Sequence, residues 1–82
     1  MVTQTIKQKY FEKEGEIALR LWSYSLILAE LEDQPNKEKL KKFYEKVLEF
    51  RTSPWIEIKS TAEECADLQK IIDELTFMLA ES

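Results

Sequence analysis

The chain has 82 residues and a mass of 9.7 kDa, which is enough for one domain with its own core. Hydrophobic residues make up 44% and charged residues 34%, with one Gly and two Pro. This composition excludes turn-rich β-sandwiches, collagen-like chains and disordered tails. Twelve basic and sixteen acidic residues give a net charge of −4, which argues against a general nucleic-acid-binding surface.

The residue types that usually carry catalysis are scarce. Histidine is absent, so the commonest general base near neutral pH and the commonest metal ligand are both missing. Cys65 is the single cysteine, and the acidic residues around it would disfavour the reactive thiolate. We therefore expect a protein that is not an enzyme, with no catalytic residues, no metal site and no cofactor.

Two further sequence patterns bear on where in the cell the protein resides. The first sixteen residues lack the apolar core of a signal peptide. The longest apolar stretch, residues 21–29, is far shorter than the roughly 20 apolar residues that cross a bilayer. We expect a cytoplasmic protein that does not associate with membranes, and a lone cysteine fits that reducing compartment.

The first predicted element is a long helix over residues 5–32. Apolar residues recur there at helical spacing, at Ile6, Tyr10, Ile17, Leu21, Tyr24, Leu28 and Leu31. Gly15 interrupts the pattern at a cost of about 1 kcal/mol relative to Ala, so a bend or break at that residue stays open.

Two more helices are predicted, over residues 36–51 and 61–80. Asn36 or Asp33 is the expected N-cap of the first, and two overlapping capping boxes at residues 60–64 place the start of the second near Thr61. The connector 52–60 contains Pro54, and for it we favour a helical turn capped by Ser53, or an irregular connector, over a short strand.

These elements predict an all-α fold in a single domain spanning residues 1–82. We expect a three-helix bundle or a helical hairpin-like chain with a long first helix, completed by dimerisation. Dimerisation is expected because the apolar surface of the first helix is much wider than the stripe of about 100° that a surface helix needs.

Several large apolar residues fall outside the predicted core. A narrow polar strip, formed by Glu16, Arg20, Ser23 and Glu30, has Ile27 at its centre and Leu19 and Leu26 along one edge. In a bundle Ile27 could be a solitary exposed residue, which is common in soluble proteins. Our preferred interpretation is a protein interface formed by Leu19, Trp22, Leu26, Ile27, Trp55 and Phe77.

The second helix carries a cluster of lysines. Residues 34–53 contain six basic and three acidic side chains, and Lys39, Lys42 and Lys46 would bind phosphates if this face contacted nucleic acid. Glutamates interleave with these lysines, so a solvated charged face is the simpler interpretation.

The sequence therefore predicts a small, non-enzymatic protein–protein interaction module. It would act as a regulator, inhibitor or accessory subunit through apolar helix faces, as a homodimer and with a further protein partner not identified by the sequence. The alternative is a nucleic-acid-associated regulator or subunit of an RNA–protein complex that uses Lys39, Lys42 and Lys46, although the charge makes nucleic acid the weaker candidate.

Overall fold

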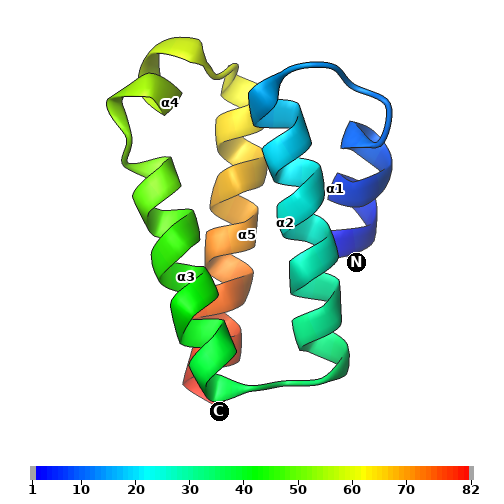
Figure 1. Ribbon diagram of the computed structural model, residues 1–82, viewed down its shortest axis with the longest axis vertical. Helices are drawn as coiled ribbons and strands as arrows, with labels where there is room; N and C mark the ends of the chain where they lie inside the picture. Colours follow the sequence, from blue (N-terminus) through cyan, green and yellow to red (C-terminus); the bar gives the residue numbers. More distant parts are fainter. Residues whose placement is uncertain (1, 82) are drawn as a thin grey trace.

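The computed structural model describes residues 2–81, which form five helices in chain order (Figure 1). The all-α prediction is confirmed, since this part of the chain contains helices and no strand. The helices are α1 (Val2–Tyr10), α2 (Glu16–Asp33), α3 (Lys37–Arg51), α4 (Pro54–Lys59) and α5 (Ala62–Glu81).

The prediction of one long first helix is wrong, because residues 5–32 belong to two helices. Helical structure stops at Tyr10 and resumes at Glu16, and Gly15 before it has φ 116° and ψ 151°. This backbone conformation is accessible to glycine and strained for residues with a Cβ. The break lets α1 fold back along α2 (Figure 1), which buries Ile6 and Tyr10 to 1% and 2% exposure.

The later boundaries follow local hydrogen bonds. Asn36 caps α3, since its side-chain oxygen accepts a hydrogen bond from the Lys39 amide at 3.2 Å. Thr61 and Glu64 form the predicted capping box of α5, with each side chain accepting from the other residue's amide at 2.8 and 3.1 Å.

The predicted connector 52–60 contains the short helix α4. Ser53 accepts a hydrogen bond from the Trp55 amide, and Pro54 occupies the first turn, where its missing N–H leaves no intrahelical bond unmade. The favoured helical turn is thus confirmed. It brings Ile56, which is fully buried, into the core.

The three long helices α2, α3 and α5 run side by side, with α1 on the far side of α2 from α3 (Figure 1). Both α2 and α3 pack against α5, whereas they touch each other only sparingly. The core lies among these helices, and its fully buried side chains include Leu21, Leu28, Val47, Leu68 and Ile71. Helix α5 contributes to it the buried side chains of Leu68, Ile72 and Leu75.

Candidate protein-docking groove

An open groove of about 1070 Å³ runs between α2 and α3, and we call it the α2–α3 groove. It exists because α2 and α3 each pack on α5 and leave a channel between them. Residues 16–31 of α2 form one wall, residues 39–50 of α3 form the other, and Trp55 of α4 lies at the end near the start of α2.

The floor of the groove is aromatic and apolar. The Tyr24 ring meets Phe43 edge-on at 5.4 Å between centroids and Phe50 at 5.8 Å, so these rings fill the space between the helices. The Tyr24 phenol is neutral at physiological pH, because its ordinary pKa is 10.0 and burial raises that pKa further. A partner entering the groove would therefore meet an uncharged floor.

The α2 wall combines exposed apolar residues with charged ones. Leu19 and Ile27 are 59% and 41% exposed, and both line the groove. Glu16 and Glu30 lie toward the two ends of this wall, and the Arg20 guanidinium lies 5.2 Å from the centroid of the Phe50 ring. The α2 wall thus offers a partner two apolar side chains that lie between two acidic ones.

The α3 wall is basic over most of its length. Lys39, Lys42 and Lys46 are spaced three and four residues apart, which places them on one helix face, and all three are exposed. The ion pairs of residues 2–81 lie elsewhere, at Lys9 and Lys70. These lysines are therefore available to carboxylates of an incoming chain.

The structure brings together half of the predicted apolar interface. Leu19, Ile27 and Trp55 line the α2–α3 groove, with Trp55 37% exposed and its ring 6.0 Å from that of Phe50. It also places them opposite the three lysines, which the sequence analysis had assigned to a separate function.

The other three predicted residues lie outside this groove. Trp22 is half-buried against the core and its ring lies 6.3 Å from that of Phe11. Leu26 is also half-buried, and Phe77 is 61% exposed on α5. None of the three lines the groove.

Sequence reasoning missed several groove residues, mainly Arg20, Ser23, Glu30, Glu49 and Phe50. The signal was present in the narrow polar strip of α2, where Glu16, Arg20, Ser23 and Glu30 surround Ile27. That strip was identified from the sequence without being assigned to a binding site, and in the structure it forms part of the α2 wall. The pairing of α2 with α3 could not be read from either helix alone.

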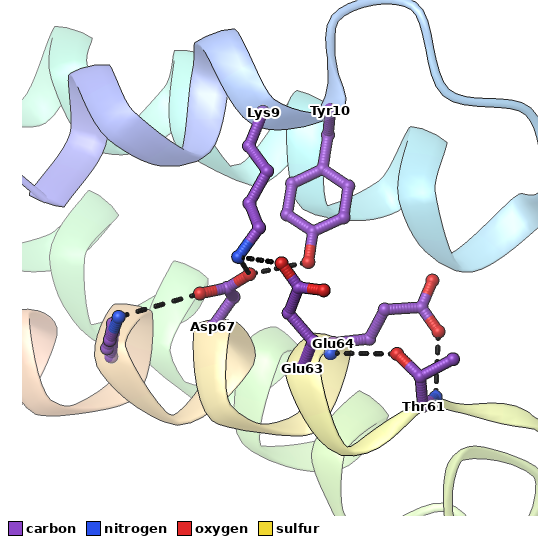
Figure 2. Close-up of polar contacts among 7 residues, drawn as sticks. Lys9, Tyr10, Thr61, Glu63, Glu64 and Asp67 are labelled. Carbon is purple, nitrogen blue, oxygen red and sulfur yellow. Dashed lines mark hydrogen bonds and ion pairs between the residues drawn. The ribbon is translucent and has the colours of Figure 1, made fainter.

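A second polar cluster, which we call the α1–α5 clamp, joins Lys9 and Tyr10 of α1 to Glu63 and Asp67 of α5 (Figure 2). The Tyr10 hydroxyl donates to Asp67 Oδ2 at 2.5 Å, and Lys9 Nζ lies 2.9 Å from the same oxygen. Lys9 also pairs with Glu63, and Lys70 Nζ lies 3.7 Å from the other Asp67 oxygen.

The charges of the clamp are mutually stabilised. Burial by itself would raise the pKa of Asp67, but hydrogen bonds from Tyr10 and Lys9 and the charges of Lys9 and Lys70 hold it below its ordinary value. The Lys9 ammonium likewise lowers the pKa of Glu63. Burial and the bond to Asp67 raise the pKa of Tyr10, so the phenol keeps its proton.

The acidic residues in the first two turns of α5 are thus committed to structural contacts. Asp67 and Glu63 bind α1, and Glu64 caps its own helix. Among the residues described, no cluster of three or more acidic or cysteine side chains is arranged to hold a metal ion. Cys65 contacts Ser60, with its Sγ 2.8 Å from the hydroxyl oxygen.

The helices of residues 2–81 include none with the length and apolar character that a bilayer crossing requires. Comparisons of the chain with protein-family models, with curated proteins and with solved structures found no match.

Proposed function

We propose that this protein is a small, non-enzymatic protein–protein interaction module that works as a homodimer in the cytoplasm, as a regulator, inhibitor or accessory subunit. The observation that carries the proposal is the α2–α3 groove, where exposed Leu19, Ile27 and Trp55 face a row of lysines across an uncharged floor. In this proposal the partner completes a helical bundle that the single chain leaves open between α2 and α3.

The shape of the groove favours a helical partner. Two adjacent helices form its walls, so a third helix can lie along the channel with its apolar stripe on the floor. Tyr24, Phe43 and Phe50 would contact that stripe, and Leu19 and Ile27 would cover its edge. Burying exposed apolar side chains contributes about 25 cal/mol per Å², which supplies the affinity.

The charges define which helix fits. Lys39, Lys42 and Lys46 lie along one side only, so the partner helix needs acidic residues on the side facing α3. Complementary charges of this kind set orientation and speed association more than they add affinity. The ligand class is therefore an amphipathic helix with one acidic edge.

Nucleic acid is the second candidate, and the specific observation in its favour is the in-line spacing of the three exposed lysines. Glu49 lies on the same wall, and Glu16 and Glu30 lie across the groove from it. A phosphate backbone running along this channel would meet acidic groups as well as basic ones. The groove geometry therefore favours the protein partner.

A designed peptide pair tests the proposal directly. The probe is a stapled helix with a Leu stripe flanked on one side by Glu, and its control carries Lys in place of Glu. At submicromolar protein, we expect fluorescence anisotropy to show about tenfold tighter binding of the acidic peptide, because only that peptide complements the lysine wall. The triple variant Lys39→Glu, Lys42→Glu, Lys46→Glu should reverse this preference.

Two outcomes would contradict the proposal. Equal, weak binding of both peptides would show that the groove does not select an acidic helix. Strong, salt-dependent binding of a single-stranded RNA oligonucleotide that is abolished in the triple lysine variant would favour the nucleic-acid candidate instead.

A further inference from the structure

We propose that the occupant of the α2–α3 groove is the same groove of a second copy, in a two-fold dimer whose axis runs parallel to α2 and α3. This inference rests on the proposed function, since it names the partner of that site. The charges along the two walls of the groove lie in a register that favours such a dimer.

The register of α2 against α3 within one chain follows from the ring contacts between them. Helices α2 and α3 are joined by the short loop at residues 34–36 and run in opposite directions (Figure 1). Tyr24 lies between Phe43 and Phe50, and the Arg20 guanidinium lies over the Phe50 ring at 5.2 Å. With a rise of about 1.5 Å per residue, Glu30 is then level with the first turns of α3, beside Lys39.

A two-fold axis parallel to the helices leaves the position of each residue along the groove unchanged. It places the α2 wall of one copy opposite the α3 wall of the other. Helix α2 of one copy then lies over α3 of the other. Glu30 comes to face Lys39 of the partner subunit, and Arg20 comes to face Glu49 of the partner subunit. Each opposite-charge pair occurs twice, because a two-fold interface is self-complementary.

The apolar residues fit the same arrangement. Ile27 is level with Phe43, so it would lie over that part of the partner's floor, and Leu19 would approach the end of the groove that Phe50 and Trp55 line. All three residues that are exposed along the groove become covered at once. The two copies together form a layer of four helices, which closes the bundle.

Other arrangements of two copies fit the charges less well. An axis perpendicular to the helices would place α2 against α2, with Glu30 near Glu16 of the partner subunit, which sets acid against acid. A head-to-tail contact, in which a different surface of one copy enters the groove of the next, does not close into a dimer and would form a ring or an open filament. The axis along the groove closes the dimer and pairs Glu30 with Lys39 and Arg20 with Glu49, while Lys42 and Lys46 lie opposite the uncharged Ile27 and Ser23 of the partner subunit.

A charge exchange between subunits tests the dimer. Light scattering over a tenfold concentration range should give wild-type protein a mass of twice 9.7 kDa. Glu30→Lys alone and Lys39→Glu alone should each weaken dimerisation by about tenfold or more, because each places two like-charge pairs in the interface. An equimolar mixture of the two variants should restore the dimer, since both pairs become attractive again in the heterodimer.

Matched controls exclude effects of charge on folding. Lys41→Glu and Glu45→Lys make the same charge changes at exposed α3 positions outside the groove lining, and both should leave the dimer intact. Restoration by mixing cannot arise from a change within one chain, so it reports the contact between copies.

The inference is overturned if the wild-type protein is monomeric throughout the concentration range, or if the mixture of variants stays monomeric. It is also overturned if neither single variant weakens the dimer, since the copies would then meet through another surface. A monomer that still binds the acidic peptide would keep the groove as a docking site for an acidic helix and lose only the homodimer, so the two failures are distinguishable.

Discussion

Asp67 is the residue whose environment departs most from that of an ordinary surface carboxylate. It is 3% exposed, and its oxygens contact three side chains, one of which is the buried phenol of Tyr10. A buried charge is stabilising only when its hydrogen-bonding capacity is satisfied, which the α1–α5 clamp achieves. The clamp therefore explains why an acidic residue occupies an interior position of α5.

Replacing Asp67 by Ala should destabilise the protein by about 2–4 kcal/mol. The substitution leaves the Tyr10 hydroxyl without its acceptor and Lys9 with only Glu63, while removing nothing from the apolar core. Urea unfolding followed by circular dichroism measures the change. The control is Asp73→Ala, because Asp73 is exposed and its contact is to Gln69 on the same helix, so we expect a change within about 0.5 kcal/mol. Equal effects of both substitutions would contradict a structural role for the clamp.

The clamp also predicts that the stability of the folded protein decreases at both low and high pH. The folded-state pKa of Asp67 lies below its ordinary 3.8, so its stabilisation is present above pH 4 and is lost as the pH falls through the lowered value. The pKa of Tyr10 is raised, so its contribution is present below its ordinary pKa of 10.0 and is lost as the pH rises above it.

Urea unfolding of wild-type protein and Asp67→Asn between pH 2 and pH 8 checks the acid limb. The stability difference should be largest near neutral pH and should shrink below about pH 4, where Asp67 becomes protonated in the wild-type protein as well. A difference that stays constant down to pH 2 would show that the charge of Asp67 does not contribute.

At the level of the elements, the break at Gly15 determines where α1 goes. A continuous helix over residues 5–32 would carry Ile6 and Tyr10 away from the core, whereas the break folds them onto α2 and α5. Burial of these two side chains and formation of the clamp more than offset the helical hydrogen bonds that the turn gives up. The backbone conformation that Gly15 can adopt thus decides where the whole of α1 packs.

Gly15→Ala should destabilise the protein by roughly 1–3 kcal/mol. No atom lies within 4 Å of the position that a Cβ would occupy, so the cost comes from the φ of +116° and not from a clash. Chemical denaturation measures the loss, and amide hydrogen exchange should show weaker protection in α1 specifically. Glu14→Ala, at the exposed neighbouring position, is the control and should have little effect. Unchanged stability in Gly15→Ala would mean that the turn tolerates another backbone conformation.

At the level of the whole molecule, the open channel between α2 and α3 is the feature that single-chain packing leaves unresolved. Both helices bury their inner faces on α5, and the chain supplies no further element along residues 2–81 to cover their shared outer edge. In the proposed two-fold dimer, the same surface of another copy covers that edge. Folding stability and association are then linked by mass action.

The melting temperature should therefore rise with protein concentration. The free energy of association is shared between the two chains of a dimer. For a domain of this size, each tenfold increase in protein concentration should therefore raise the melting temperature by about 3–5 °C. Differential scanning calorimetry of wild-type protein measures the trend, and Glu30→Lys should show a nearly flat dependence over the same range. A concentration-independent melting temperature in the wild-type protein would contradict folding linked to dimerisation.

The sequence by itself determined the helices and most of their ends. Apolar residues at helical spacing identified the helical segments, Asn36 and the Thr61–Glu64 capping box marked the starts of α3 and α5, and Ser53 with Pro54 favoured the turn that became α4. These signals are readable because they depend on neighbours within about four residues, where the geometry of a helix fixes which groups meet.

The tertiary structure alone decided how the helices combine. Whether Gly15 bends or breaks a helix depends on what Ile6 and Tyr10 can contact, and Asp67 is explained only once α1 lies on α5. The meeting of Leu19 and Ile27 with Lys39, Lys42 and Lys46 likewise needs α2 and α3 side by side. Such contacts join residues distant in the chain, and their formation depends on the packing of whole helix faces, which local spacing does not encode.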